Sequence, residues 1–175
     1  MLMRLSAFLF LGTFIPAILC AQTAKTNSTD ESQQQLFGWV EKVAIYPGGV
    51  VLDGKLDTGA DHCSLHAKKV KKFKRNGKTW VKFKIKNRDG IQQTFELPTY
   101  RRARIKSKGG DSQTRHVVRL GLCLGGHYRE VDVNLVDRSN FSLPVLIGRS
   151  FLAGEALVDS SKTYTTNPSC SEVEE

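Results

Sequence analysis

The chain has 175 residues, a formal net charge of +9 and 40% hydrophobic residues. This length allows about one domain of ordinary size, which is enough for a buried core and excludes a protein of two lobes. Three cysteines remain once an N-terminal leader is set aside, and this odd number excludes a framework in which every cysteine pairs within the chain.

Residues 1–21 have the pattern of a secretory signal peptide. Arg4 supplies the positive charge, Leu5–Leu19 is almost wholly apolar, and Ala21 is a small residue at the expected cleavage position. The apolar run is shorter than the ~20 residues that a membrane-spanning helix needs. We therefore expect an exported protein, periplasmic or secreted, without stable membrane insertion after removal of the signal.

The remainder of the chain is expected to form one domain between two flexible ends. Residues 22–36 are rich in Thr, Ser, Asn and Gln and predict a flexible leader. Residues 167–175 combine proline, serine and acidic side chains and predict a flexible tail. Residues 37–166 then form the folded domain.

The cysteines that follow the leader are Cys63, Cys123 and Cys170. An oxidising compartment would allow two of them to form a disulfide. Free or partly buried thiols fit the sequence equally well, so the pairing stays open at this point.

The pattern of apolar residues along the first part of the domain predicts short strands. Val40, Val43 and Ile45 begin the first strand, and the short apolar run Val50–Leu52 follows a Pro47-Gly48-Gly49 turn. Asp53-Gly54 is a hairpin signal, and Lys55-Leu56 continues the chain beyond it.

The middle of the chain predicts a pair of hairpins, near residues 68–97. Asn76-Gly77 is the strongest hairpin signal, and Trp80–Lys86 alternates between apolar and polar residues as a half-buried strand does. Asp89-Gly90 predicts a turn into the strand Ile91–Leu97, which ends at Pro98.

Two more hairpins and one helix complete the expected elements. Gly109-Gly110 lies between Arg101–Lys106 and Thr114–Leu120, and Gly125-Gly126 precedes Tyr128–Val136. The single helical candidate is a short one that starts near Gly148. Many short strands with frequent turns predict an all-β fold, either a closed barrel or a sandwich.

The positive charge is concentrated between Lys68 and Arg88, where eleven residues are lysine or arginine and none is acidic. This segment is either the solvated face of a hairpin or a surface that attracts acidic peptides, cell-wall polymers or lipid headgroups. Nucleic acid is not an expected partner, because the protein is expected to be exported and no aromatic stacking motif is interleaved with the charge.

Asp57-Thr58-Gly59 is the candidate catalytic motif. It follows an apolar strand end and is followed by Ala60, which predicts a tight loop. The triplet alone is weak, but Val145–Arg149 is an apolar strand that runs into a glycine, and the Gly109-Gly110 hairpin lies between the two segments.

These motifs resemble the retropepsin-like aspartic peptidases. Leu56–Asp61 is similar to the catalytic loop of retroviral proteases, and Leu146–Leu152 is similar to their strand-to-helix segment. Within this fold the chain most resembles a bacterial family often named ATP-dependent zinc proteases. The matching segments are Gly38–Val40, Lys55–Ala67, Gly77–Val81, Leu143–Leu152 and Val158-Asp159.

The resemblance implies a retropepsin-like acid-protease barrel with one short C-terminal helix and one half-site per chain. Two carboxylates held close cannot both ionise, so together they supply the acid and the base that activate a water molecule. Because Asp-Thr-Gly occurs once in the sequence, the second Asp57 must come from another copy in a homodimer. The expected activity is aspartic endopeptidase cleavage of a peptide or protein, without a cofactor.

The resemblance also assigns roles to individual residues. Asp57 is the catalytic carboxylate, Thr58 links the two loops of the dimer, and Gly59 permits close approach of the substrate. Gly148 and Arg149 support the loop, and Arg149 is expected to form an ion pair with Asp61. The substrate-binding residues are expected to be Ala60, Asp61, Lys108, Gly109 and Gly110, the last three in a flap.

Departures from the retroviral pattern leave alternatives open. The basic stretch near residues 68–97 is an insertion, and the flap is polar, which favours acidic peptides over apolar ones. A non-catalytic peptide- or polymer-binding module on the same fold is the main alternative.

A zinc protease is a weaker alternative. It rests on four possible ligands: Asp61, His62, Cys63 and His66. The glutamate that serves as general base after the first histidine of a His-Glu-x-x-His site is replaced by Cys63, so no metal is expected. No Walker loop supports ATP dependence.

Overall fold

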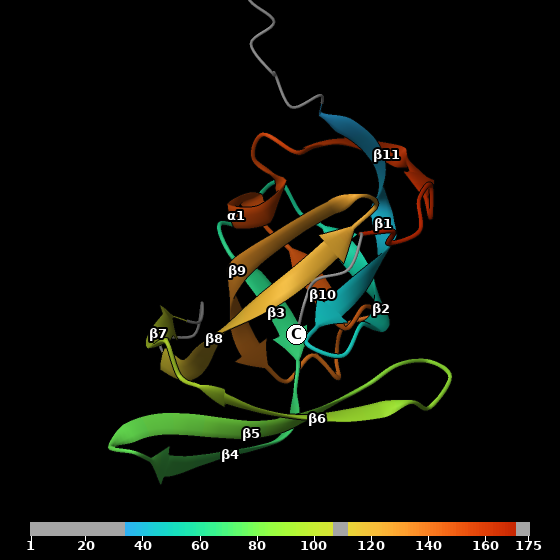
Figure 1. The fold of residues 1–175 in the computed structure, drawn as a ribbon. Helices are drawn as coiled ribbons and strands as arrows, with labels where there is room; N and C mark the ends of the chain where they lie inside the picture. Colours follow the sequence, from blue (N-terminus) through green and yellow to red (C-terminus); the bar gives the residue numbers. More distant parts are fainter. Residues whose placement is uncertain (1–33, 107–111, 171–175) are drawn as a thin grey trace, which may run out of the picture. The chain divides into compact units, whose positions relative to one another are not determined.

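Six strands close into a barrel in the computed structural model, which describes residues 34–106 and 112–170 (Figure 1). The strands are β1 (Gln35–Tyr46), β2 (Val50–Leu56), β3 (Cys63–His66), β4 (Lys68–Arg75), β5 (Lys78–Lys86), β6 (Gln92–Pro98), β7 (Arg101–Lys106), β8 (Ser112–Leu124), β9 (His127–Val136), β10 (Val145–Ile147) and β11 (Ala156–Thr163). One short helix, α1 (Arg149–Leu152), follows β10. This architecture confirms the predicted all-β barrel with a single C-terminal helix.

The barrel closes because β1 pairs on both of its edges. Around the barrel the order is β1, β2, β10, β3, β9 and β8, and β8 returns to β1 through the pairs from Val43–Leu124 to Tyr46–Gly121. Closure removes the free edges that an open sheet would expose. β11 continues the sheet beyond β1, and β7 continues it beyond β8.

The core is made of the inward-facing residues of these strands. Val43, Ile45 and Leu52 from the first two strands are at most 4% exposed, and Ile147 and Phe151 close the core beneath α1. The alternation of buried and exposed positions along β5 and β2 is what strands with one solvated face require.

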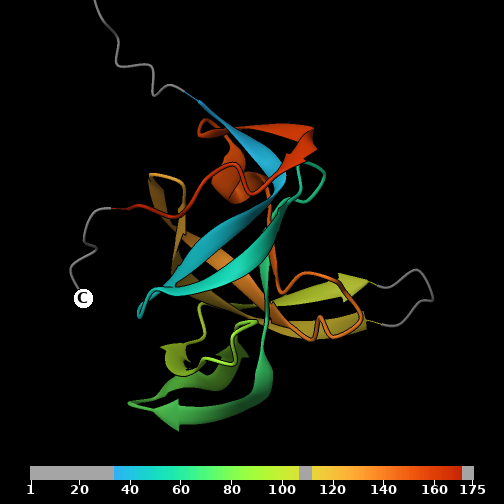
Figure 2. The same cartoon turned by 90° about the vertical axis from the view of Figure 1, so that its right-hand side faces the viewer.

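The inserted segment forms a separate three-stranded sheet, β4-β5-β6, which lies at the end of the barrel opposite α1 (Figure 2). Val81, Phe83 and Ile85 of β5 are buried, and the Phe83 ring stacks on Phe95 at 5.1 Å between centroids. The intervening lysines of β5 therefore point to the opposite face, as the alternating sequence predicts.

Four of the predicted turns are where the sequence places them. Pro47-Gly48-Gly49, Asn76-Gly77, Asp89-Gly90 and Gly125-Gly126 connect consecutive strands. β7 and β8 pair antiparallel from Arg101–Val117 to Lys106–Ser112, which confirms a hairpin between them. Its expected tip at Gly109-Gly110 lies outside the described residues.

The predicted Asp53-Gly54 turn is wrong, because both residues lie inside β2. Gly54 pairs with Glu41 of β1 and with Val145 of β10. A Cβ atom at Gly54 would be 2.8 Å from Val43 Cγ2. The glycine thus permits close packing between neighbouring strands instead of reversing the chain.

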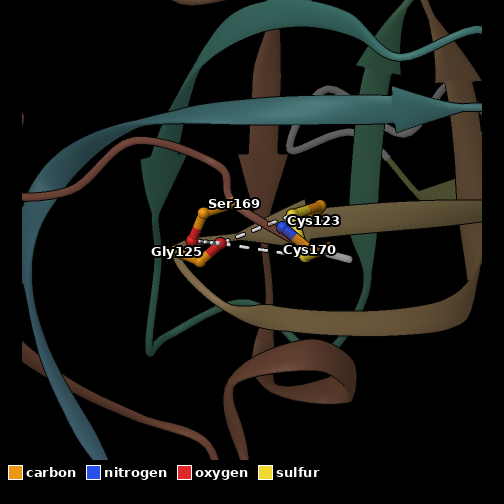
Figure 3. The surroundings of a disulfide bond; sticks show 4 residues. All are labelled: Cys123, Gly125, Ser169 and Cys170. Carbon is orange, nitrogen blue, oxygen red and sulfur yellow. Dashed lines mark hydrogen bonds between the residues drawn. A yellow bond between two sulfur atoms is a disulfide. The ribbon is translucent and has the colours of Figure 1, made fainter. Parts of the chain in front are cut away.

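The chain after β11 is fastened to the barrel at two places. Glu41 is fully buried, and its carboxylate accepts hydrogen bonds from the backbone N–H of Gly38, Thr165 and Thr166 and from both threonine hydroxyls. Cys123 and Cys170 form a disulfide, and Ser169 N donates to Gly125 O at 2.7 Å (Figure 3).

These contacts change the expected limits of the folded part. Residues 167–170, expected to be flexible, are fixed by the Cys123–Cys170 disulfide. β1 begins at Gln35, within the segment expected to be a leader. The signal segment 1–21, most of the leader and residues 171–175 lie outside the described residues.

All described residues belong to one compact unit. Across residues 34–106 and 112–170, no helix has the length and apolar character needed to cross a bilayer.

Candidate active site

Asp57 lies immediately after β2, on a tight loop anchored to β10. β10 runs parallel to β2, and the backbone N–H of Asp57 donates to Ile147 O at 2.8 Å. Ala60 N then donates to Asp57 O at 3.1 Å, which closes the turn. The hydrogen bond to the end of β10 and the hydrogen bond within the turn therefore fix the position of the Asp57 backbone.

The Asp57 carboxylate has two partners and stays accessible. Gly59 N donates to Oδ1 at 3.1 Å, and Lys55 Nζ lies 3.2 Å from Oδ2. The Asp57 side chain is 26% exposed, so a substrate or a second chain can reach it. The contact with Lys55 was not foreseen, although residues two apart on a strand share one face and could have indicated it.

Arg149 braces this loop from α1. Its guanidinium forms an ion pair with Asp61 and donates to Thr58 O at 2.9 Å. Its backbone N–H donates to Ala60 O at 2.8 Å. The structure therefore contains the predicted Asp61–Arg149 ion pair. Arg149 also donates hydrogen bonds to the backbone carbonyls of Thr58 and Ala60.

Gly148 allows α1 to approach the loop this closely. A Cβ atom at this position would lie 2.7 Å from His62 O and 2.9 Å from Ala60 O. The backbone N–H of Gly148 also donates to the Cys63 thiol at 3.4 Å. A larger residue here would push the helix away from the Asp57 loop.

Arg138 adds positive charge near Asp57, Arg115 adds it near Arg138, and sequence reasoning missed both arginines. Arg138 is 7% exposed, and its guanidinium donates to Leu143 O and to Ser64 Oγ. Burial lowers the pKa of Arg138, the charge of Arg115 lowers it further, and the charge of Asp57 acts in the opposite direction. The Arg138 guanidinium therefore interacts with the charges of both Arg115 and Asp57, although no local pattern in the sequence relates residues so far apart.

The four residues considered as zinc ligands do not form one site. Asp61 is paired with Arg149, and Cys63 is buried on β3 beside Gly148 and Ser150. The imidazole Nδ1 of His66 accepts from the backbone N–H of Arg138 at 2.7 Å. Within the part of the chain that the structure describes, no three His, Cys, Asp or Glu residues gather as a metal site.

Burial also makes the Cys63 thiol a poor metal ligand. Burial raises the pKa of the Cys63 thiol, although the donors at Gly148 and Ser150 partly oppose this, and a zinc ligand must be a thiolate. Burial lowers the pKa of His66, which favours the neutral imidazole, but its Nδ1 already accepts the Arg138 N–H. Lys108, Gly109 and Gly110, the expected flap residues, lie outside the described residues.

A family model described as the retropepsin-like aspartic endopeptidase RimB matches residues 36–169. The chain belongs to the RimB-like family. This confirms the resemblance to retropepsin-like aspartic peptidases that the Asp57 loop and the Gly148 segment indicate.

Curated relatives of this RimB-like chain carry a different name. Proteins of Shewanella halifaxensis and Shewanella pealeana, each described as a probable alpha-L-glutamate ligase, are 33% identical over 120 residues. The match covers 67% of this chain and 26% of each relative, so the chain spans about a quarter of their length.

A crystal structure of a Legionella pneumophila protein of unknown function has a similar fold. It is 32% identical to this chain, with a TM-score of 0.64, and the match covers 75% of this chain and 98% of the other.

Proposed function

We propose that this RimB-like protein is an aspartic endopeptidase in which the Asp57 carboxylates of two copies activate one water molecule. The observation that carries the proposal is the accessible Asp57 carboxylate on a loop fixed by Gly59, Ile147 and Arg149. One carboxylate, charged, takes a proton from the water, and the other, protonated, donates to the scissile carbonyl.

The need for two copies follows from the count of half-sites. The sequence holds a single Asp-Thr-Gly, and the shared-proton mechanism requires two carboxylates in contact. A two-fold axis beside the Asp57 loops would supply the second one. It would also bring the exposed Thr58 residues of the two loops together.

Mixing inactive and active chains tests whether the site is shared. Asp57→Asn chains, added in excess to wild type under conditions that allow subunit exchange, are expected to suppress cleavage, because each mixed dimer has only one carboxylate. Asp89→Asn is the matched control, since Asp89 lies in an exposed turn. Wild-type activity that does not change with added Asp57→Asn chain would contradict a shared site.

We propose acidic peptides as the substrate class. The positive charge of Arg138 near Asp57, the charge of Arg115 near Arg138 and the cations of the β4-β5-β6 sheet support this choice. The relatives described as glutamate ligases, which contain a similar segment, are consistent with substrates rich in glutamate.

A peptide library with each position varied tests the substrate class. Arg115→Gln is expected to raise KM for acidic peptides more than for neutral ones, because Arg115 adds positive charge around Arg138, whose charge interacts with that of Asp57. Arg104→Gln is the matched control, since Arg104 pairs with Thr114 and lies on the other face of the β7–β8 hairpin. A preference for apolar residues on both sides of the cut would remove the acidic-substrate proposal.

We also propose export to an oxidising compartment. The Cys123–Cys170 disulfide supports it, because disulfides persist in exported proteins and are rare in reducing compartments. Cell fractionation of the full-length chain tests this directly, and recovery of the uncleaved chain in the cytoplasm would contradict it.

A further inference from the structure

A cavity of about 660 Å³ opens where the β4-β5-β6 sheet meets the β7–β8 hairpin. Its walls carry a set of basic side chains: Lys72, Lys74, Lys78, Arg101, Arg102 and His116. No acidic residue lines it. The cavity is distinct from the Asp57 loop, none of whose residues lines it.

The positive charge in this cavity is largely uncompensated. Among the ion pairs formed by the described residues, Arg101 alone of these cations has a carboxylate partner, Asp132 at 3.4 Å, and Asp132 is shared with Arg119. Burial lowers the pKa of His116, and the charges of Arg102 and Lys72 lower it further. The imidazole thus experiences the positive potential that the other side chains create.

The walls of the cavity are held in place without a ligand. Thr99 N donates to Thr79 O at 2.9 Å, and Tyr100 N donates to Val117 O at 2.9 Å. These bonds fix the connection between β6 and β7 to β5 on one side and to β8 on the other. A preformed site loses little conformational entropy when a ligand binds.

The cavity also offers apolar surface and neutral hydrogen-bond groups. Pro98 contributes apolar area beside the cations. Thr99 Oγ1 lies 3.3 Å from His116 Nδ1, and Lys74 Nζ donates to Thr79 Oγ1 at 3.0 Å. A few polar groups around an apolar floor are typical of small-molecule sites.

We infer that this cavity binds a compact organic anion that carries two or more carboxylate or phosphate groups on an apolar body. The anionic groups contact cations from both walls, Lys72 and Lys74 on one face of the sheet and Arg102 on the hairpin, and the apolar body lies against Pro98. The site goes beyond the proposed peptidase activity and does not depend on Asp57.

Calorimetry with benzene-1,3,5-tricarboxylate tests this site on the inactive Asp57→Asn chain at constant ionic strength. We expect saturable binding of one anion per chain and no binding of the neutral benzene-1,3,5-tricarboxamide. Inorganic triphosphate serves as the phosphate probe, and tetraglutamate represents carboxylates supplied by a peptide. The use of the inactive chain separates the result from any failure of the peptidase proposal.

Variants with matched charge changes locate the binding. Lys72→Gln with Arg102→Gln is expected to weaken binding by at least about tenfold, because two charged contacts are lost. Lys71→Gln with Lys84→Gln removes the same charge from positions outside the cavity, and binding is expected to change by less than about twofold.

Three results would overturn the inference. They are no saturable binding of either small anion, an equal loss in the two double variants, and tighter binding of tetraglutamate than of the tricarboxylate. The second would show that only the overall charge matters, and the third would assign the cavity to a peptide.

Discussion

The Arg149 side chain connects the candidate motif to the helix behind it. Its guanidinium reaches Asp61 and Thr58 O, while its backbone N–H reaches Ala60 O. The planar fork of an arginine can serve two acceptors at once, which the ammonium group of a lysine cannot reproduce. Arg149 thus positions the loop and does not need to contact the substrate.

Replacement of Arg149 by alanine is expected to loosen the Asp57 loop. Because the ion pair is well exposed, the loss of stability should be only about 1 kcal/mol, or a few degrees in Tm. The loss of dimer assembly and of cleavage should be larger than this, because the loop must be ordered at the interface.

Arg149→Lys should fall between wild type and Arg149→Ala. Thermal melting, sedimentation and peptide cleavage measured on all three chains check this order. Unchanged sedimentation and unchanged cleavage in Arg149→Ala would count against the bracing role.

At the scale of elements, the segment after β11 is held to the barrel by hydrogen bonds to a buried carboxylate and by a disulfide. Glu41 on β1 accepts hydrogen bonds from Gly38, Thr165 and Thr166 while fully buried. Burial alone raises the pKa of Glu41, but the donors of Thr165, Thr166 and Gly38 outweigh it and hold the pKa below its ordinary value of 4.5.

Stability should therefore depend on pH through Glu41. The pKa of Glu41 is lower in the folded chain than in the unfolded chain. The stabilisation that the Glu41 charge provides is therefore complete above the ordinary value of 4.5, and it is lost as the pH falls through the folded pKa. Glu41→Gln should cost about 2–3 kcal/mol at neutral pH, because it removes charged hydrogen bonds.

Urea unfolding of both chains across the acid range checks this prediction. The difference between wild type and Glu41→Gln should shrink as the pH falls. A difference that stays constant with pH would show that the Glu41 charge does not matter.

The disulfide is the second fastening of this segment. Removal of the Cys123–Cys170 bond, which closes a loop of 47 residues, should cost about 2–4 kcal/mol according to the chain-entropy model. Cys170→Ser should show this loss in denaturant unfolding, and a reductant should destabilise wild type but leave Cys170→Ser unchanged. Equal stability of wild type and Cys170→Ser in the absence of reductant would show that the disulfide does not stabilise the fold.

Sequence patterns predicted most of the individual strands and turns. The alternation in β5 and the Asn76-Gly77 and Gly125-Gly126 turns depend on local geometry, so they can be read from neighbouring residues. Asp53-Gly54 was misread, because a glycine that permits close packing and a glycine that permits a turn look alike in a sequence.

At the scale of the whole molecule, pairing between distant segments was less predictable. The closure of the barrel through β1 and β8 and the Cys123–Cys170 bond both join residues far apart in the chain. The position of Arg138 near Asp57 is of the same kind, since it depends on where the barrel brings two loops together. By contrast, the Asp61–Arg149 pair was foreseen because the family resemblance carries that long-range information.

The RimB-like barrel contributes one Asp57 loop per chain, so the proposed activity is a property of an assembly. A lone chain would have no partner for the shared proton of two carboxylates. The oligomeric state and the cleavage activity should therefore change together, and dilution should reduce the activity per chain as dimers dissociate.

The most direct test is cleavage of a peptide library by the mature chain between about pH 3 and 8, a range in which two coupled carboxylates titrate. Wild type should cleave both with and without a chelator, Asp57→Asn should lose at least about 100-fold, and Asp89→Asn should remain active. Cleavage by Asp57→Asn at the wild-type rate, or wild-type activity abolished by the chelator, would contradict the dimeric aspartic peptidase.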